Sequence, residues 1–180
     1  IYGGKTKKKK ACSQEEIIEG MILYAKKNKK VLRLKGGDLS FFSRGSQEIE
    51  CLKKNKVAFK IYSGITSSQS ALKCFGLPFF NENNVCNFIT GHRKINEKSV
   101  SKDLKKILKN KGRIIIYMGV GQIREISTEL IDLGMNKNTK VFIVSNASHS
   151  SESFFKSNIS KVSEMIIKKS ISPPSIIIIN

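Results

Sequence analysis

Four short segments carry residue types that could bind a ligand and do chemistry on it. They are residues 33–38 (Arg-Leu-Lys-Gly-Gly-Asp), 63–67 (Ser-Gly-Ile-Thr-Ser), 90–92 (Thr-Gly-His) and 117–122 (Tyr-Met-Gly-Val-Gly-Gln). Glycines let a backbone approach a ligand closely, and hydroxyl, amide and carboxylate groups can bond to its polar atoms. Taken singly, each segment is also compatible with an ordinary turn or a helix start.

These segments lie at or just after apolar runs that have the length and composition of β-strands. We expect strands at residues 31–34, 57–62, 85–90, 113–118, 140–145 and 175–180. The helical spacing of apolar residues predicts helices at 14–28, 66–75, 101–110, 123–133 and 160–169. Alternating strands and helices predict an α/β fold with mainly parallel pairing, in which ligands bind at the carboxyl ends of strands.

Polar stretches near the middle of the chain indicate a domain boundary. The most polar segment is 81–84, and a second polar segment follows at 92–102. We therefore expect two α/β domains, residues 1–80 and residues 81–180.

The charge of the chain has two interpretations. Its 180 residues include 33 lysines and arginines against 14 acidic residues, a formal net charge of +19. An anionic partner such as nucleic acid, an anionic membrane or a polycarboxylate would explain this charge. A compositional bias would also explain it, because lysine, asparagine and isoleucine are abundant throughout. We favour the bias for most lysines, because few aromatic residues are interleaved with them as a nucleic-acid platform would need.

The cysteines and apolar runs exclude some classes of protein. The four cysteines form no Cys-x-x-Cys pair, and none lies near a histidine at zinc-site spacing. Reduced thiols and no metal site are therefore expected. No apolar run is long enough to cross a bilayer, and the Lys-rich start lacks the apolar core of a signal peptide. We expect a soluble cytoplasmic protein and leave an organelle open.

Taken together, the four segments resemble the tetrapyrrole methylases. The uroporphyrinogen-III C-methyltransferase branch of that family reads R-L-K-G-G-D-P-x-x-F-G-R-G, then P-G-I-T, T-G-H and Y-M-G. Residues 33–45, 64–66, 90–92 and 117–119 follow these motifs in the same order. The Gly-Gly-Asp with its later Arg-Gly, and the Tyr-Met-Gly-Val-Gly-Gln segment, separate this branch from methyltransferases of later precorrins. The resemblance covers essentially the whole chain.

The resemblance implies a fold, a reaction and a cofactor. The fold is the two-domain tetrapyrrole methylase fold, with S-adenosylmethionine bound in a cleft between the domains. The reaction is methyl transfer to C2 and C7 of uroporphyrinogen III, which gives precorrin-2 for sirohaem or cobalamin biosynthesis and releases S-adenosylhomocysteine. Such enzymes are typically homodimers, and the resemblance implies no metal.

The resemblance also implies the residues that contact S-adenosylmethionine. The glycines among these residues permit close backbone approach, and the aspartate carboxylate can accept from hydroxyl or amino groups. The residues at the expected helix start offer free N–H groups. Met118 has an alternative interpretation as a buried core methionine. The implied cofactor-binding residues are Gly36, Gly37, Asp38, Phe41, Thr66, Ser67, Met118 and Ala147.

Two basic residues match catalytic positions of the family. Lys5 aligns with the lysine assigned as proton donor, although it could be one more lysine in a Lys-rich segment. Arg44 matches the arginine of F-G-R-G, which can pair bidentately with substrate carboxylates and can assist proton removal. Arginine is scarce in this chain, which favours a role for Arg44. The implied substrate-binding residues are Arg44, Gln47 and Met118.

The sequence departs from the family pattern in several places. The family's G-x-G-x-G-D loop and the aspartate of its L-Y-D-x-L segment, assigned as proton acceptor, have no match here. We therefore expect the first domain to be incomplete and the activity of the chain alone to be impaired. Leu39, Ser43 and Gln47 replace the usual proline, glycine and glutamate, which puts a charge-dependent role at position 47 in doubt.

Two alternative functions stay open at this point. One is a methyltransferase that acts on a later precorrin, which substrate conversion would distinguish. The other is a non-catalytic basic remnant that binds nucleic acid, which salt-dependent binding would support. We expect neither nucleic acid nor a membrane as the partner.

Overall fold

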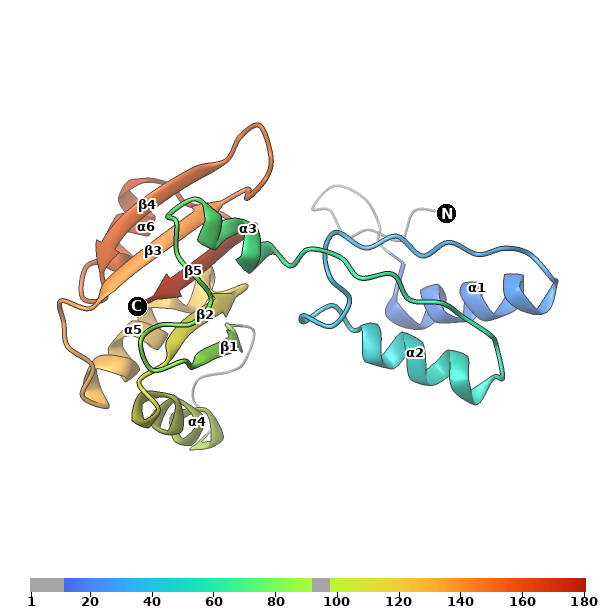
Figure 1. Ribbon diagram of the computed structural model, residues 1–180, viewed down its shortest axis with the longest axis horizontal. Helices are drawn as coiled ribbons and strands as arrows, with labels where there is room; N and C mark the ends of the chain where they lie inside the picture. The colour runs from blue at the N-terminus through green and yellow to red at the C-terminus, as the bar shows by residue number, and fades with distance from the viewer. Residues whose placement is uncertain (1–11, 92–97) are drawn as a thin grey trace. The chain divides into compact units, whose positions relative to one another are not determined.

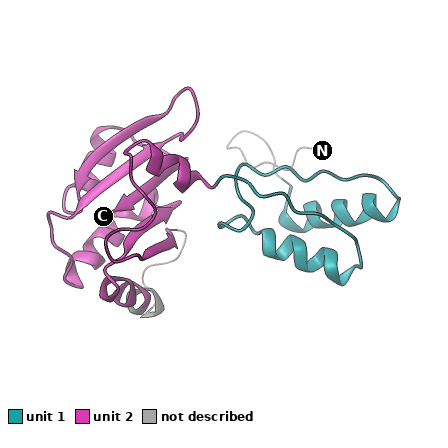
Figure 2. Ribbon diagram, viewed as in Figure 1, with its two compact units in different colours: residues 1–65 teal, residues 66–180 magenta. Residues whose placement is uncertain are grey.

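The computed structural model describes residues 12–91 and 98–180 (Figure 1). The chain forms two compact units, residues 1–65 and residues 66–180, which are described separately (Figure 2). The domain division expected from the sequence, at residue 80, stays a prediction. Helix α3, Ser67–Lys73, falls in the second compact unit, where it contacts strand β5.

The first unit begins with helix α1, Gln14–Lys26, close to the bounds predicted from the sequence. Its N-terminus is a capping box, in which Ser13 Oγ accepts from Glu16 N at 3.1 Å and Glu16 Oε2 accepts from Ser13 N at 2.5 Å. This exchange satisfies two backbone donors that a helix start otherwise leaves without partners. The capping box is confirmed as the reason why the helix begins here.

Helix α2, Gly45–Lys54, packs against α1 and was missed by sequence reasoning. It is short and carries few apolar residues, so apolar composition gave little indication of it. Charge placement supports it instead, with Glu48 in the first turn, Lys53 and Lys54 in the last turn, and a Glu50–Lys54 ion pair of 2.9 Å. Acidic residues near the start of a helix and basic residues near its end interact favourably with the helix dipole and stabilise the helix.

The two apolar segments of the first unit that we predicted as strands, 31–34 and 57–62, are not strands in the structure. They follow α1 and α2 and run in the same direction (Figure 1). Among the described residues, no backbone hydrogen bond joins one segment to the other. A β-strand needs a neighbouring strand to which its backbone N–H and C=O groups can bond. These two segments have the composition of strands but do not bond to each other, so they are extended without being part of a sheet.

The second unit contains a five-stranded sheet with the order β1-β2-β5-β3-β4. Its strands are β1 Cys86–Thr90, β2 Arg113–Tyr117, β3 Lys140–Ser145, β4 Ser153–Asn158 and β5 Ser175–Ile179. Its helices after α3 are α4 Lys98–Lys109, the 3₁₀ turn η1 Val120–Gln122, α5 Ile123–Asp132 and α6 Val162–Lys168. The predicted α/β class is therefore confirmed, and β4 is the strand that the sequence prediction missed.

The expectation of mainly parallel pairing is wrong for this sheet. Only the β1–β2 pair is parallel among the described residues, and α4 makes the crossover between the two strands. β5 is antiparallel to both β2 and β3, and β3 is antiparallel to β4. The link 146–152 is too short for a parallel crossover, so β4 can only return beside β3. The length of the connection decides the direction of β4 relative to β3. The pattern of apolar residues does not predict that direction.

The sheet is covered on both faces. On one face, residues of β2, β3 and β5 form a core with α5 and α6 that includes Ile116, Ile143, Leu130 and Ile177. On the other face, Phe75 beyond α3 packs on Phe142 of β3 with ring centroids 4.8 Å apart. This double cover explains why β2 and β5 are continuous apolar runs that are buried at every position.

None of the helices in the described ranges is long and apolar enough to cross a membrane.

Candidate functional site

The strand directions bring several candidate residues of the second unit to one edge of the sheet. β1, β2 and β3 run in the same direction, because β5 lies between β2 and β3 and is antiparallel to both. Their carboxyl ends therefore lie at the same edge, where Thr90 pairs with Tyr117 and Ser145 pairs with Ser175. The loops that leave β1, β2 and β3 all start from this edge.

The loops after β1 and β2 touch at backbone level. Gly91 N donates to Tyr117 O at 2.8 Å. A Cβ atom on Gly91 would lie 2.5 Å from Gly119 Cα and 2.7 Å from Met118 O, so no side chain fits at position 91. Met118 has a left-handed φ of 52° and is 43% exposed. The interpretation of Met118 as a buried core methionine is therefore wrong, and the residue is exposed enough to contact a ligand.

Buried hydroxyl groups fix the start of α3 to the end of β2. Tyr117 OH donates to Ser68 Oγ at 2.6 Å and lies 2.5 Å from Thr66 Oγ1. Thr66 is the residue before α3, yet its hydroxyl makes no capping bond to the helix. Ser67, between these two residues, is exposed. The cluster therefore holds Thr66 inside the fold and leaves Ser67 available to a ligand.

Ala147 lies in the loop that follows β3. The preceding Asn146 donates its backbone N–H to Pro174 O at 2.9 Å, and the buried hydroxyls of Ser145 and Ser175 are 2.7 Å apart. Ala147 itself is half-buried. The structure thus places Met118 and Ala147 in loops at the same edge of the same sheet.

In the first unit, Asp38 links two loops that are distant in sequence. Its Oδ1 accepts from Ser40 N at 2.8 Å and from the Ser40 hydroxyl, and its Oδ2 accepts from Gly64 N at 3.0 Å. The hydrogen bonds from the Ser40 side chain, then the Ser40 and Gly64 backbones, lower the pKa of Asp38 below its usual value. Asp38 is therefore ionised near neutral pH, and its carboxylate is used for bracing these loops.

The two Gly-containing loops of the first unit approach each other closely. A Cβ atom on Gly64 would lie 2.7 Å from Gly37 O, and one on Gly37 would lie 3.5 Å from Ile65 O. Gly36 has open space around its Cα. The close backbone approach thus explains glycine at position 64, whereas packing does not require glycine at position 36.

The candidate substrate residues of the first unit lie around the start of α2. Arg44 is the N-cap residue with a left-handed φ of 59°, and its side chain is exposed. Gln47 is also exposed, in the first turn of α2, and Phe41 is half-buried in the loop before it. A guanidinium held at a fixed backbone position and open to solvent can pair with a carboxylate.

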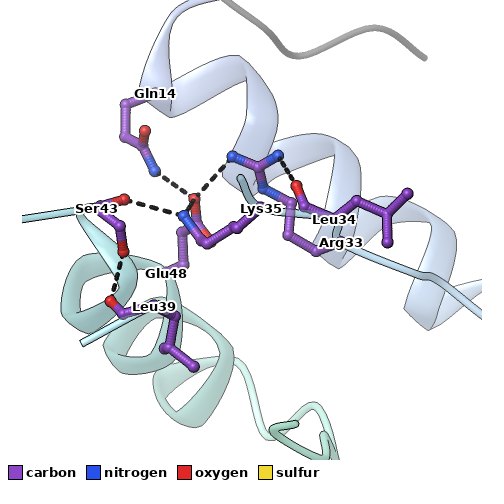
Figure 3. Close-up of polar contacts among 7 residues, drawn as sticks. All are labelled: Gln14, Arg33, Leu34, Lys35, Leu39, Ser43 and Glu48. Carbon is purple, nitrogen blue, oxygen red and sulfur yellow. Dashed lines mark hydrogen bonds and ion pairs between the residues drawn. The ribbon is translucent and has the colours of Figure 1, made fainter. Parts of the chain in front are cut away.

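Behind this loop lies a buried polar cluster that sequence reasoning missed (Figure 3). Glu48 is only 4% exposed, and its Oε1 accepts from Gln14 Nε2 at 2.9 Å, Lys35 Nζ at 3.0 Å and Arg33 at 3.3 Å. Lys35 Nζ also donates to Ser43 O at 2.9 Å. Burial raises the pKa of Glu48, but the hydrogen bonds from Gln14 and Lys35 and the charges of Lys35 and Arg33 hold it below its usual value.

The signal for this cluster in the sequence was weak. Gln14, Lys35 and Glu48 are widely separated, and each is an ordinary polar residue on its own element. Only the Arg-Leu-Lys alternation of residues 33–35, which puts two cations on one side of an extended segment, indicates a shared acidic partner.

The predicted site residues thus form two groups, one in each compact unit. The first unit brings Gly36, Gly37, Asp38, Phe41, Arg44 and Gln47 into one loop and helix start, and the second unit holds Thr66, Ser67, Met118 and Ala147. Lys5, the predicted proton donor, lies outside the described residues. Within the described ranges, no three His, Cys, Asp or Glu side chains gather in a way that could hold a metal ion.

The fold and these loops are those of a methylase family. The chain belongs to the tetrapyrrole (corrin/porphyrin) methylases, whose family profile matches residues 2–163. The uroporphyrinogen-III C-methyltransferase of Bacillus subtilis is 33% identical over 181 aligned positions, which cover 99% of this chain and 70% of that protein. The family resemblance seen in the four sequence segments is confirmed.

Longer relatives and solved structures agree with this assignment. A siroheme synthase of Nitrosospira multiformis is 35% identical over 150 residues, which cover 82% of this chain. The chain spans only 31% of the length of that relative. A uroporphyrin-III C-methyl transferase from Thermus thermophilus, complexed with S-adenyl homocysteine, matches with a TM-score of 0.75 and 28% identity over 93% of this chain and 73% of that one. A cobalt precorrin-4 methyltransferase shares the fold, with a TM-score of 0.82 at 18% identity over 94% of this chain and 71% of that one.

Proposed function

We propose that this chain is the methylating part of a protein that transfers methyl groups from S-adenosylmethionine to C2 and C7 of uroporphyrinogen III, giving precorrin-2. Family membership and the names of the Bacillus and Thermus relatives support this proposal. The observation that carries it is the sheet edge of the second unit. There Met118 is exposed beside Gly91 and Gly119, whose backbones lie close together. Because neither glycine has a side chain, a ligand can approach the backbone at this place.

The residues at this edge suit S-adenosylmethionine chemically. Such a ligand presents an adenine and a ribose, which need close backbone and hydroxyl contacts, and a methyl group on a positively charged sulfonium. Gly91, Ser67 and Ala147 can approach the polar parts, and the soft thioether of Met118 can contact the region around sulfur. When bound, S-adenosylmethionine supplies an electrophilic methyl that a pyrrole carbon takes by in-line displacement, releasing S-adenosylhomocysteine.

In this proposal the first unit holds the tetrapyrrole. Uroporphyrinogen III carries many carboxylates, and Arg44 offers a rigid donor fork that pairs with one of them bidentately. Gln47, in the first turn of α2, can donate to a neighbouring oxygen. Orientation by such contacts converts a slow encounter into a reaction between groups held at contact distance.

Methyl transfer leaves a positive charge on the ring system, so the reaction also needs a proton to leave that ring system. We assign Lys5 to proton donation and Arg44 to assisting proton removal, following their matches to the family motifs. Arginine itself stays charged and cannot accept the proton, so Arg44 would assist by placing a like charge near the methylated ring cation, which favours loss of its proton. A homodimer, as family members form, belongs to the same proposal.

A product assay tests the proposed function. The product of the complete reading frame is incubated with S-adenosylmethionine carrying an isotopically labelled methyl group and with uroporphyrinogen III, and the tetrapyrroles are separated by mass. We expect a gain of two labelled methyl groups and a product identical to precorrin-2.

Three controls decide between the alternatives. Precorrin-2 offered as the methyl acceptor tests for a later methyltransferase, and label appearing only there would contradict the proposed substrate. The Arg44→Ala variant should lose most of the uroporphyrinogen III activity. If no tetrapyrrole gains label while the protein binds nucleic acid with a steep salt dependence, the basic-remnant alternative replaces the proposal.

A further inference from the structure

The loop that carries the candidate substrate arginine has an unusual backbone. Phe42 has a φ of 48° and Arg44 has a φ of 59°, so two non-glycine residues on either side of Ser43 are left-handed. Such conformations are unfavourable for residues with a Cβ atom and persist only where the surroundings enforce them. The position of Arg44 therefore depends on contacts that hold this loop.

Lys35, just before the loop begins, contacts Ser43, the residue between Phe42 and Arg44. Lys35 Nζ donates to Ser43 O at 2.9 Å, so it joins the two ends of the loop 36–43 (Figure 3). The Ser43 hydroxyl bonds to Leu39 O within the loop. Lys35 is thus placed to fix the peptide unit that directly precedes Arg44.

Packing holds the other side of Arg44. A Cβ atom on Gly45 would lie 2.6 Å from Leu39 O and 2.7 Å from Leu39 Cδ1, so the first residue of α2 sits directly against the loop. Glu48 N donates to Arg44 O at 3.3 Å in the first turn of the helix. Arg44 is therefore held between a helix start that cannot move toward Leu39 and a carbonyl that Lys35 holds.

Glu48 in turn holds the ammonium of Lys35. The two groups are 3.0 Å apart, and their side chains are only 14% and 6% exposed. Gln14 and Arg33 also donate to Glu48, so its carboxylate is fixed by three side chains from two elements, helix α1 and the extended segment 33–35. A buried ion pair with these additional bonds has a defined geometry, and a lysine drawn out of it would leave a buried carboxylate short of a partner.

We propose that Lys35 is a positioning residue for Arg44: held by Glu48, it fixes the Ser43 carbonyl and so sets the place at which the guanidinium meets a substrate carboxylate. This rests on the proposed function, in which Arg44 binds a carboxylate of the tetrapyrrole. Lys35 acts on the substrate only through the backbone of Arg44.

The chain offers a matched control for a test of this proposal. Lys54 pairs with Glu50 at 2.9 Å on the same helix α2, but both side chains are largely exposed, at 70% and 65%. Lys35→Gln and Lys54→Gln therefore remove the same charge from the same unit, one inside the cluster and one outside it. Lys35→Arg keeps the charge and can donate to both Glu48 and Ser43.

The first measurement is hydrogen–deuterium exchange on peptides spanning 36–48, which needs no activity. We expect Lys35→Gln to speed exchange at the start of α2 about tenfold, while Lys54→Gln leaves it unchanged and Lys35→Arg restores most of the protection. Unchanged exchange in Lys35→Gln overturns the proposal, even if the chain proves to have a different substrate.

The second measurement is steady-state methylation of uroporphyrinogen III. We expect Lys35→Gln to raise KM about tenfold and to lower kcat by less than about twofold, because it weakens substrate binding. In an Arg44→Ala background the same substitution should have no further effect on KM. An equal extra loss in that background would overturn the proposal by showing that Lys35 acts independently of Arg44. Absence of wild-type methylation would instead contradict the proposed function, and the exchange measurement then decides the positioning role alone.

Discussion

The two compact units use similar apolar sequences to different effect. In the second unit, Ile177 and Ile178 of β5 have no exposed surface, because strands lie on both sides and helices cover both faces. In the first unit, Leu32 and Leu34 are 78% and 74% exposed on an extended segment that has no ladder partner among the described residues. An apolar run is only a potential strand, and a neighbouring strand decides whether it becomes one.

The forces that hold each unit differ accordingly. The second unit is stabilised by burial of apolar surface, at about 25 cal/mol per Å² removed from water. Among the described residues of the first unit, Met21 is the only buried hydrophobic side chain. This unit relies instead on the polar cluster around Glu48. Substitutions should therefore act through packing in one unit and through charge and hydrogen bonding in the other.

The largest effect is expected from Ile177→Ala in the centre of the sheet. Removing this fully buried side chain leaves a cavity among residues of α5, β2 and β3, which should lower the free energy of unfolding by about 4 kcal/mol. Leu32→Ala removes a similar side chain from an exposed position and should change it by less than about 0.5 kcal/mol. Urea unfolding followed by circular dichroism measures both, and equal losses would show that the two apolar runs are not buried differently.

Local signals in the sequence predicted the start of the first unit and much of the second. The Ser13–Glu16 capping box and the apolar runs of β2 and β3 depend on residues close in sequence, and these predictions agree with the structure. The direction of β5, and whether the 31–34 segment has a strand to pair with, depend on distant parts of the chain. Apolar patterning contains no information about either.

The site divides in the same way. Glycine motifs and the scarcity of arginine pointed to Arg44 and to the loops at strand ends, because these signals lie within short segments. The Lys35–Glu48 pair and the hydroxyl cluster at Tyr117 join residues from separate elements. Their partners could be named only once the fold had brought those elements together.

The next largest effect is expected from Glu48→Gln in the first unit. The substitution leaves Lys35 and Arg33 without their carboxylate and should cost about 2 kcal/mol near neutral pH. Because the folded-state pKa of Glu48 is lowered, its charge stabilises the fold above the ordinary glutamate pKa. That stabilisation is lost as the pH falls through the lower, folded-state pKa.

The pH dependence separates this effect from general damage. Hydrogen exchange of the first unit, measured from neutral to acidic pH, should show stability falling in the wild type and changing less in Glu48→Gln. Glu50→Gln, on the exposed face of the same helix, is the matched control and should keep the wild-type dependence. A Glu48→Gln protein with an unchanged acid dependence would mean that the cluster does not hold the first unit together.

A smaller effect is expected from Tyr117→Phe at the sheet edge of the second unit. The ring stays in place, but the buried hydroxyls of Thr66 and Ser68 lose a partner, which should cost about 1–2 kcal/mol. Protection should fall in α3 and stay unchanged in α5, on the opposite face of the sheet. Loss spread evenly over the second unit would show that the cluster supports the whole sheet and not specifically the start of α3.

Binding of S-adenosylhomocysteine, measured by isothermal titration calorimetry, tests the central claim most directly. Since the chain spans only part of the length of its relatives, the titration uses both the 180-residue chain and the product of its complete reading frame. We expect the complete product to bind one ligand per subunit, and Met118→Lys, which puts a cation where the thioether lies, to weaken binding at least about tenfold. If the complete product binds no ligand, or if Met118→Lys leaves the affinity unchanged, the sheet edge of the second unit is not the cofactor site and the proposed function is contradicted.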